Sequence, residues 1–211
     1  REFFQPAEPL FRLTPLNRKL ALFEKLGLKL AFVQNFDQHF AQLSAQEFIE
    51  RVLVAGLGVS HVIIGYDFYF GHKRAGNPQM LVDAGRDLGF GVTVMAPVAE
   101  AGEVFSSSAV RVYLAQGDVK GATHVLGDTW RVQGKIVGGA KRGTGMGFPT
   151  ANIPMPKGTA LAHGIYAVRA HVDGAVHNAA AYLGTRPTFD NGMPVLEVFL
   201  IDFQGYLYSQ E

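Results

Sequence analysis

The pattern of apolar residues changes at residues 127–128, and this change constrains the fold more than any other feature of the 211-residue chain. Between residues 14 and 116, segments with helical spacing alternate with short apolar runs. Such alternation predicts crossover units on a parallel sheet. After Gly127 only strand-like runs appear, separated by glycine and proline, which is typical of a small all-β barrel. We therefore predict an α/β domain over residues 1–126 and an all-β domain over residues 127–211.

Capping residues and apolar spacing predict the helices of the first domain. Thr14 and Pro15 begin the first helix, and Ser44-x-x-Glu47 is a capping box. Asn77 begins another helix, and Ser107 or Ser108 is expected to cap the next. The predicted helical segments are 15–26, the segment after 44, 77–88, the segment carrying Val110 and Leu114, and 118–126.

Apolar runs predict the strands. The first domain should contain strands at 28–34, 61–64 and 92–95, and the second at 130–137, 164–171, 175–183 and 195–203. Asp173-Gly174 between two of these runs is a hairpin signal. Ligands of parallel sheets bind beyond the carboxyl ends of the strands, which directs attention to the loops 65–77 and 96–108.

Composition limits the classes of protein. The formal net charge is +1, which argues against a dedicated nucleic-acid binder. The chain has no cysteine, which excludes disulfides and thiolate metal sites. No apolar run long enough for a membrane span and no signal peptide are seen, so we expect a cytoplasmic protein without a membrane partner. The opening Arg1-Glu-Phe-Phe4 suggests that the chain begins inside a longer protein.

The glycine-rich stretch Gly134–Asn152 is the strongest candidate for a ligand loop. Lys135, Lys141 and Arg142 lie among its glycines, and exposed backbone N–H groups beside cations favour a phosphate. Thr150 and Asn152 follow, two residues apart, so on a strand they share a face and offer hard oxygen donors suited to Mg²⁺. The alternative is a flexible hairpin between barrel strands.

Glu197 is the candidate catalytic residue of the second domain. It lies in the apolar run Pro194–Leu200. A lone carboxylate in such a run is either a solvated outward residue or a general base made more basic by its surroundings. Strand alternation by itself favours the solvated residue.

Two further constellations lie in the first domain. Gly65-Tyr-Asp-Phe-Tyr-Phe-Gly71 could stack on a flat ring through Phe68 and Phe70 and bind its edge through Asp67; alternatively both phenylalanines are buried and Asp67 caps a turn. Ser106 to Arg111 could bind phosphate at a helix start, or could be an ordinary N-cap with a solvated arginine.

Taken together, these motifs resemble the bacterial bifunctional riboflavin kinase/FMN adenylyltransferases, also called FAD synthetases. The most specific motif is Gly147-Phe-Pro-Thr-Ala-Asn-Ile153. The segments 164–166, 184–188 and 197–208 follow in the family's order, and 65–71 and 106–111 match the adenylyltransferase module.

The resemblance implies a nucleotidyltransferase-type parallel domain followed by a six-stranded riboflavin kinase barrel. It implies that Glu197 is the general base on the riboflavin 5′-hydroxyl and that Thr150 and Asn152 bind Mg²⁺ and the phosphates of ATP. The nucleotide would be covered by the loop 138–147, with contacts from Gly138, Lys141, Arg142, Gly143 and Gly147. The flavin would be bound by Asp67, Phe68, Phe70 and Arg186, and the phosphate in the first domain by Ser107, Ser108 and Arg111.

The chain departs from the family at both ends. The family's first strand, with a Gly-Asn-Phe-Asp-Gly turn and a His-x-Gly-His pair, is not found here, and Ser209 replaces a glycine that precedes a final strand and helix. We therefore expect two incomplete domains, with FMN adenylylation lost in this segment. The expected function is flavin nucleotide biosynthesis from riboflavin, FMN and ATP; the alternative is a non-catalytic flavin- or nucleotide-binding module.

Overall fold

The computed structural model describes residues 11–137, 150–156, 158–185 and 193–203. Contacts divide the chain into two compact units, one formed by Phe23–Phe105 and the other by Arg1–Leu22 together with Ser106–Glu211. The domain boundary predicted near residue 127 is a different division, and it stays a prediction.

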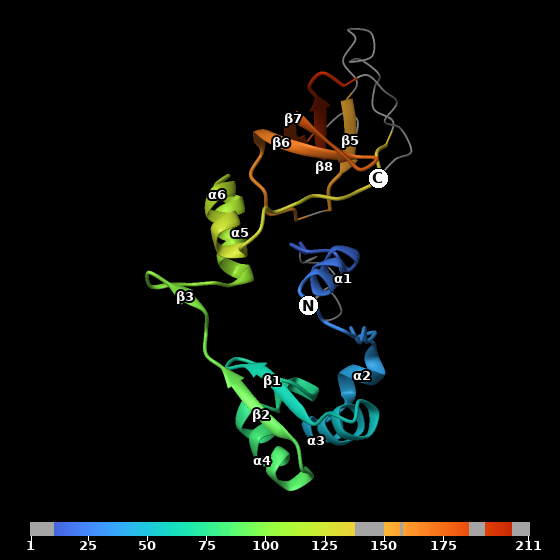
Figure 1. Cartoon of the computed structure of the whole chain (residues 1–211), viewed down its shortest axis with the longest axis vertical. Helices are drawn as coiled ribbons and strands as arrows, with labels where there is room; N and C mark the ends of the chain where they lie inside the picture. The colour runs from blue at the N-terminus through green and yellow to red at the C-terminus, as the bar shows by residue number, and fades with distance from the viewer. Residues whose placement is uncertain (1–10, 138–149, 157, 186–192, 204–211) are drawn as a thin grey trace. The chain divides into compact units, whose positions relative to one another are not determined.

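A parallel crossover organises the unit Phe23–Phe105. Strand β1 (His61–Gly65) leads through helix α4 (Pro78–Leu88) to strand β2 (Gly91–Met95), and the two strands pair in parallel (Figure 1). The register runs from His61 opposite Gly91 to Gly65 opposite Met95. This confirms the predicted parallel pairing, and it places the starts of the loops after Gly65 and Met95 at the same edge.

The ends of two helices in this unit follow the predicted signals. Asn77 caps α4 by accepting a hydrogen bond from the N–H of Met80 at 3.0 Å, and Gly89 ends the helix in the left-handed conformation. The capping box is confirmed: the Ser44 hydroxyl accepts from the Glu47 N–H at 3.1 Å, and the Glu47 carboxylate accepts from the Ser44 N–H at 3.0 Å. That helix, α3 (Ala45–Glu47), continues with π-type turns as η1 (Phe48–Gly56).

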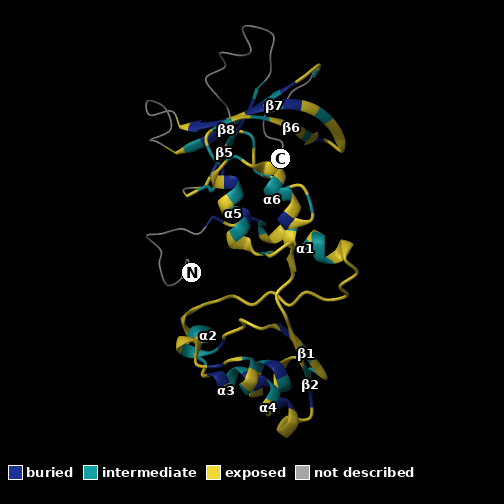
Figure 2. Ribbon diagram, turned by 90° about the vertical axis from the view of Figure 1, so that its left-hand side faces the viewer, coloured by how far each residue is buried: buried dark blue, intermediate teal, exposed yellow. Residues whose placement is uncertain are grey.

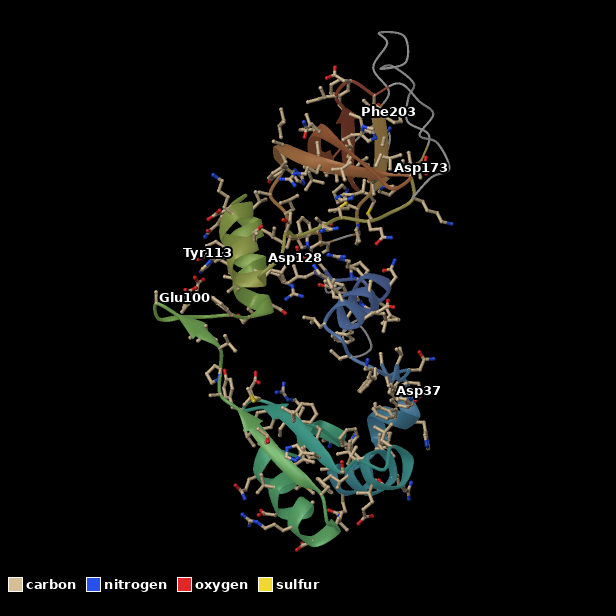
Figure 3. All side chains as sticks on the ribbon, viewed as in Figure 1. Asp37, Glu100, Tyr113, Asp128, Asp173 and Phe203 are labelled. Atoms are coloured by element: carbon tan, nitrogen blue, oxygen red, sulfur yellow. The ribbon has the colours of Figure 1, made fainter. Side chains whose placement is uncertain are left out.

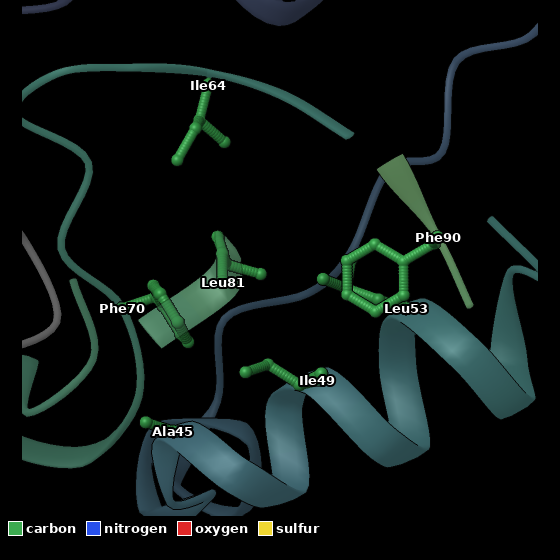
Figure 4. Close-up of a cluster of buried hydrophobic side chains, with 7 residues drawn as sticks. All are labelled: Ala45, Ile49, Leu53, Ile64, Phe70, Leu81 and Phe90. Carbon is green, nitrogen blue, oxygen red and sulfur yellow. The ribbon is translucent and has the colours of Figure 1, made fainter. Parts of the chain in front are cut away.

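An apolar cluster of described residues forms the core of this unit (Figure 4). Helix η1, strand β1, helix α4 and the loop after β1 all contribute side chains to it. Ile49 and Leu81 are completely buried, and each contributes about 2 kcal/mol of burial free energy. The remaining members are Ala45, Leu53, Ile64, Phe70 and Phe90.

Short elements complete the unit. Helix α2 (Gln38–Gln42) is capped by Asp37, η2 (His72–Arg74) is a single 3₁₀ turn, and β3 (Ala99–Glu100) pairs with β4 (Glu103–Val104) in a hairpin that the sequence reading missed. The division between the two units falls after Leu22, within the sequence of helix α1 (Leu16–Lys25). This helix forms in the predicted segment, beginning directly after Pro15, and none of its residues is buried.

The predicted strand at 28–34 is wrong. The segment has no regular secondary structure and is exposed, which Figure 2 shows as a yellow stretch between α1 and α2. Leu30 is 82% exposed. A strand needs a neighbour for its backbone hydrogen bonds, and among the described residues β1 and β2 pair only with each other.

An antiparallel sheet dominates the second unit. Four strands lie in the order β5-β8-β7-β6, with bounds β5 Thr150–Pro154, β6 Gly164–Val172, β7 Ala175–Thr185 and β8 Pro194–Leu200. The predicted hairpin is confirmed, because Asp173 and Gly174 both have positive φ and join β6 to β7 by a two-residue turn. The strand predicted at 195–203 ends earlier, at Leu200, where the chain turns through Asp202.

One face of the sheet carries its most deeply buried side chains, and we call it the inner face. Leu183 of β7 and Leu200 of β8 are 0% and 2% exposed. Tyr166 of β6 donates its hydroxyl to the carbonyl oxygen of Ala162 at 2.7 Å, and burial raises its pKa. The opposite, outer face carries the polar residues predicted for catalysis.

The predicted strand at 130–137 is wrong for most of its length. Only Val137 forms a bridge, to Asn152 of β5, and residues 130–136 form no ladder. Trp130 instead donates its indole N–H to the carbonyl oxygen of Leu13 at 3.1 Å and contacts Phe11 edge to face. Trp130 therefore anchors the N-terminal segment of this unit instead of pairing in the sheet.

Helices α5 (Ser107–Ala115) and α6 (Val119–Leu126) precede the sheet in this unit. Helix α6 forms in the predicted segment, and the Asp118 carboxylate caps it by accepting from the Gly121 N–H at 2.8 Å. The predicted cap of α5 at Ser107 or Ser108 is wrong: Ser106 has the extended conformation of an N-cap and accepts from the Ala109 N–H at 3.1 Å.

An ion pair joins the N-terminal segment of this unit to the chain after α6. The Arg18 guanidinium lies 3.0 Å from the carboxylate of Asp128, which is labelled in Figure 3.

The described residues thus form a mixed α/β protein with a parallel strand pair and an antiparallel sheet. Ladders among the described strands do not close into a barrel, so the six-stranded barrel stays a prediction. Within the described part of the chain, no helix combines the length and apolar character needed to cross a membrane.

Candidate functional site

The outer face of the antiparallel sheet brings three sequence-distant residues into one row. Asn152 of β5 lies directly opposite Glu197 of β8, and Glu197 lies directly opposite Tyr182 of β7. Side chains that are directly opposite project from the same face of a sheet. The strand register therefore unites the predicted metal-binding residue Asn152 with the predicted general base.

The hydrogen-bonding pattern shows that Asn152 and Glu197 form the closer type of cross-strand pair. The carbonyl oxygen of Asn152 accepts from the Val137 N–H at 2.9 Å, on the side away from β8. In an antiparallel strand the N–H and C=O of one residue point to the same side, so Asn152 faces Glu197 without exchanging backbone hydrogen bonds. Such pairs have Cα atoms about 4.5 Å apart, and their side chains lie close together.

Burial differs across this pair. Asn152 is 5% exposed, and it is the one polar residue among the buried side chains of the described chain. Glu197 is partly exposed, between the buried Leu196 and Val198. A carboxylate at this position is reachable from solvent, while the carboxamide beside it is held in a shielded position.

Thr150 joins the same outer face. It lies on β5 two residues before Asn152 and is opposite Phe199 of β8. A hydroxyl, a carboxamide and a carboxylate are all oxygen donors of the kind that Mg²⁺ accepts. Among the described residues no cluster of three or more histidine or acidic side chains could hold a metal. The hydroxyl, carboxamide and carboxylate oxygens fit Mg²⁺ as it is held in phosphate-transferring sites, where a few protein ligands are completed by substrate phosphates and water.

Several predicted ligand residues lie outside the described part of the chain. These are Gly138, Lys141, Arg142, Gly143 and Gly147 of the glycine-rich loop, and Arg186 of the segment after β7. Their predicted roles in binding ATP and flavin stay predictions.

Sequence reasoning missed Tyr182 and its relation to Gly184. A Cβ added at Gly184 would lie 2.5 Å from Cζ and 2.6 Å from Cε1 of Tyr182. The tyrosine ring thus leans along β7 over Gly184, and any side chain there would displace it. The sequence did hold a signal for the position of Tyr182. Counted along the strand that follows the Asp173-Gly174 turn, Tyr182 falls on the face opposite to Leu183.

The loop after β1 divides its aromatic residues between core and surface. Phe70 is 6% exposed and belongs to the apolar cluster, which fits the alternative that it is a structural residue. Phe68 is 37% exposed and stacks on Phe70 with ring centroids 5.5 Å apart. The Asp67 carboxylate points back toward Gly65. Its Oδ1 lies 3.1 Å from the position that a Cβ atom on residue 65 would occupy.

Arg111 of α5 is engaged with backbone carbonyl groups. Its Nε and Nη2 donate to the carbonyl oxygen of Phe11 at 3.3 and 3.1 Å, and its Nη1 donates to that of Ser107 at 3.0 Å. Three of the five N–H donors of the guanidinium are used in these bonds. Ser107 and Ser108 lie in the first turn of α5, beside this arginine.

Comparison with family models assigns both halves of the chain. The model described as FAD synthetase matches residues 1–109, and the model described as riboflavin kinase matches residues 126–211. The chain belongs to the bifunctional riboflavin kinase/FMN adenylyltransferase family. Members of this family are enzymes of flavin nucleotide biosynthesis with kinase and nucleotidyltransferase activities that use ATP.

Curated relatives support the assignment over the whole chain. The bifunctional riboflavin kinase/FMN adenylyltransferase of Haemophilus influenzae is 38% identical over 211 residues, covering 100% of this chain and 68% of that protein. The protein of the same name from Bacillus subtilis is 36% identical over 206 residues, covering 96% of this chain and 65% of that protein. The chain thus spans about two thirds of the length of these relatives.

A solved structure shares the fold. A crystal structure described as a macrolide-efflux protein from Streptococcus pneumoniae superposes with a TM-score of 0.80 at 26% identity, covering 96% of this chain and 67% of that one. The activity in that title belongs to the Streptococcus pneumoniae protein and is not transferred to this chain.

Proposed function

We propose that the outer face of the antiparallel sheet phosphorylates riboflavin, with the Asn152–Glu197 pair at its centre. The observation that carries this proposal is the direct cross-strand placement of a buried carboxamide beside a solvent-reachable carboxylate. Phosphoryl transfer to an alcohol needs a positioned base next to a site for metal-bound phosphates. Glu197 supplies the base and Asn152 supplies part of the site for metal-bound phosphates, and the two residues lie on adjacent strands.

Glu197 accepts the proton of the riboflavin 5′-hydroxyl as the oxygen attacks the terminal phosphate of ATP. General-base catalysis requires the carboxylate to lie within hydrogen-bonding distance of that hydroxyl. The position of Glu197 on β8, a strand paired on both sides, supports this role because it fixes the backbone beneath the carboxylate.

Thr150 and Asn152 hold Mg²⁺ and orient the phosphates on the β5 side of Glu197. When bound, Mg²⁺ supplies neutralisation of the charge on the transferring phosphoryl group. The loop 138–147 then covers the nucleotide, with Lys141 and Arg142 beside the phosphates. The glycine content and cations of this loop support that role.

The architecture that we propose is the family's: a nucleotidyltransferase-type domain over residues 1–126 and a riboflavin kinase domain over residues 127–211, with β5 to β8 as four strands of a six-stranded barrel. The two family matches, which end at residue 109 and begin at residue 126, support this division.

In the first domain we propose that Asp67 and Phe68 contact the flavin during adenylylation of FMN. Phe70 acts from beneath, as the buried ring on which Phe68 stacks. Ser107, Ser108 and Arg111 contribute phosphate contacts at the start of α5, and the carbonyl bonds of Arg111 hold its guanidinium beside that helix end.

The test replaces Glu197 by glutamine, which keeps size and polarity but removes the base. FMN formation from riboflavin and ATP should fall by at least about 100-fold, while ATP binding measured by calorimetry stays within a factor of two. Retained turnover in Glu197→Gln removes Glu197 as the base. If the unaltered chain binds riboflavin without turning over ATP, the non-catalytic binding module is the better description.

A further inference from the structure

The loop that follows β1 contains three consecutive basic residues: His72, Lys73 and Arg74. Phe70 and Gly76 close the chain around them, because the N–H of each residue donates to the carbonyl oxygen of the other, at 3.2 and 2.9 Å. A Cβ added at Gly76 would lie 2.6 Å from the ring of Phe70, so a side chain there would displace that buried ring. We call residues 71–75 the basic turn, a closed part of the loop whose base is fixed on the apolar cluster.

The basic turn is held against the segment between α2 and α3. The backbone N–H of His72 donates to the carbonyl oxygen of Leu43 at 2.7 Å, and its Nδ1 lies 3.2 Å from the carbonyl oxygen of Ala41. Gly71 packs so closely that an added Cβ would lie 2.5 Å from the backbone nitrogen of Ala45. These contacts hold the turn from one side, while its lysine and arginine side chains stay exposed.

Lys73 and Arg74 have a backbone conformation that glycine adopts most easily. Their φ values are +53° and +60°. A residue with a Cβ atom is strained at such values, and two of them in succession are uncommon. Glycine would relieve the strain at either position. Strained residues concentrate at ligand-binding sites, so the conformation points to a use for the two long cationic side chains.

The two cations of the basic turn differ from the other arginines of this unit. Arg51 and Arg86 each lie 3.1 Å from a carboxylate. Neither Lys73 nor Arg74 forms an ion pair with any residue that the structure describes. The Arg74 guanidinium instead lies over the ring of Tyr69, 5.1 Å from the ring centroid. A cation–π contact orients a guanidinium without neutralising it, so both positive charges are available to an anion.

The basic turn belongs to the same loop as the proposed flavin contacts Asp67 and Phe68. This loop begins at the carboxyl end of β1, where ligands of parallel sheets bind. Phe68 and Tyr69 are 37% and 50% exposed, and Arg74 contacts the second of these rings. Asp67 is the one acidic residue in the sequence 65–77, and its carboxylate points back toward Gly65. A surface for a flat ring and a cationic surface are therefore contiguous.

One substrate of the family combines the two matching groups. FMN joins a flat ring system to a phosphate through a ribityl chain, whereas riboflavin has the ring and the chain without the phosphate. ATP carries phosphates, but a ligand that places its ring on Phe68 as the flavin does must bring its own phosphate to the neighbouring turn. Charge-assisted contacts to a phosphate are strong, and a site built for a charged group rejects an analogue that lacks it.

We infer that the basic turn binds the phosphate of FMN through Lys73 and Arg74 while Phe68 contacts the ring system. This inference rests on the proposed flavin contacts of the first domain and deepens them, because it makes Lys73 and Arg74 the residues that distinguish FMN from riboflavin. Adenylylation needs that distinction, since only FMN has a phosphate oxygen that can be joined to the α-phosphate of ATP.

The experiment follows amide hydrogen exchange of the peptide that covers residues 66–76 in the full chain, with FMN, riboflavin or ATP added singly. The readout is local, so flavin bound at the antiparallel sheet does not contribute to it. FMN should slow exchange at a concentration about 10-fold or more below that needed with riboflavin. Lys73→Gln/Arg74→Gln should need equal concentrations of the two flavins. Arg86→Gln is the matched control and should keep the difference, because Arg86 is an exposed arginine of the same unit.

Glycine at the same two positions separates ligand binding from folding. Lys73→Gly/Arg74→Gly removes the strain of the positive φ values, so the Tm should not fall. The preference for FMN over riboflavin should nevertheless disappear, because the two charges are gone. A glycine variant that keeps the preference would overturn the inference.

The remaining outcomes separate this inference from the proposed function. If FMN and riboflavin protect the segment equally in the unaltered chain, the inference is overturned and the flavin contacts of Asp67 and Phe68 stand. If neither flavin protects it, those contacts and the inference fail together. Protection by ATP at a lower concentration than FMN would assign the turn to the nucleotide and overturn the inference as well.

Discussion

Asn152 and Glu197 are direct cross-strand neighbours that face each other without exchanging backbone hydrogen bonds. Pairs of this type hold their side chains closer than the alternate pairs of the same ladder. The carboxamide is buried and the carboxylate is partly exposed, so one member can order a metal-bound phosphate while the other meets an incoming hydroxyl.

Replacing Asn152 by alanine should weaken the binding of one substrate, Mg·ATP, and leave the binding of the other, riboflavin, nearly unchanged. We expect the affinity for Mg·ATP to fall by at least about 10-fold, because an interaction with a charged group is worth about 1.5–3 kcal/mol. Riboflavin affinity should remain within a factor of two. Titration calorimetry of each ligand measures both effects, with thermal unfolding as a check that the buried position tolerates alanine.

Asn152→Asp is the matched variant, since it keeps an oxygen donor at the same place. It should retain most of the Mg·ATP affinity that alanine loses. An equal loss of ATP and riboflavin binding in Asn152→Ala would contradict the metal-binding role.

Replacing Gly184 by alanine should act through the ring of Tyr182. The new Cβ cannot coexist with the ring atoms that now lie 2.5 and 2.6 Å from its position. Because the ring is half exposed, it can turn outward, so the free energy of unfolding should change by less than about 1 kcal/mol.

The double variant Gly184→Ala/Tyr182→Ala provides the control for this mechanism. Two changes that act through one side chain are not additive. The double variant should therefore have the free energy of unfolding of Tyr182→Ala alone, and a further loss would show that Gly184 acts independently of the ring.

The capping box of α3 should make stability depend on pH in acid. Hydrogen bonds from the backbone N–H and then the hydroxyl of Ser44 lower the pKa of Glu47 below its usual 4.5, and the nearby Arg51 adds to this. A carboxyl with a lowered folded-state pKa stabilises the folded state above its unfolded pKa, and this contribution is lost as the pH falls through the folded value.

The measurement is the free energy of unfolding from about pH 7 down to about pH 3, compared between the unaltered protein and Glu47→Gln. The difference between them should be constant at neutral pH and should shrink only below about pH 4.5. A difference that changes between pH 5 and 7 would indicate a different titrating group. Ser44→Ala should cost about 1 kcal/mol at neutral pH, as loss of an N-cap does.

The two stacked phenylalanines of the loop after β1 should respond differently to alanine. Phe70→Ala should cost about 3–5 kcal/mol of unfolding free energy, because it empties a site in the apolar cluster. Phe68→Ala should cost less than half as much, since Phe68 is 37% exposed, and should instead weaken FMN binding. Chemical denaturation and FMN titration test the pair; equal destabilisation would show that both residues are structural.

The sequence could predict features that depend on neighbouring residues. The ends of α4 follow from Asn77 and Gly89, and the Asp173-Gly174 turn fixes the register of β6 against β7. From that register alone, the pairing of Tyr182 with Ile165 could have been derived. The family motifs around Thr150, Asn152 and Glu197 also pointed to the residues that the sheet brings onto one face.

Features that depend on distant partners could not be predicted. The apolar run 28–34 has the composition of a buried strand, but composition does not say whether a neighbouring strand is present to satisfy its backbone. Trp130 was assigned to a strand, yet its indole bonds to Leu13. The pairing of β5 with β8 likewise joins segments with no short turn between them, so no local signal sets its register.

The central position of β8 has a consequence for the lifetime of the candidate site. Both edges of this strand are bonded, to β5 and to β7, so its amide protons should exchange with solvent more slowly than those of β6, which pairs with β7 alone among the described strands. Fraying at the margins of the sheet then leaves Glu197 in register. Loss of the base from its working position would require opening of the whole antiparallel ladder.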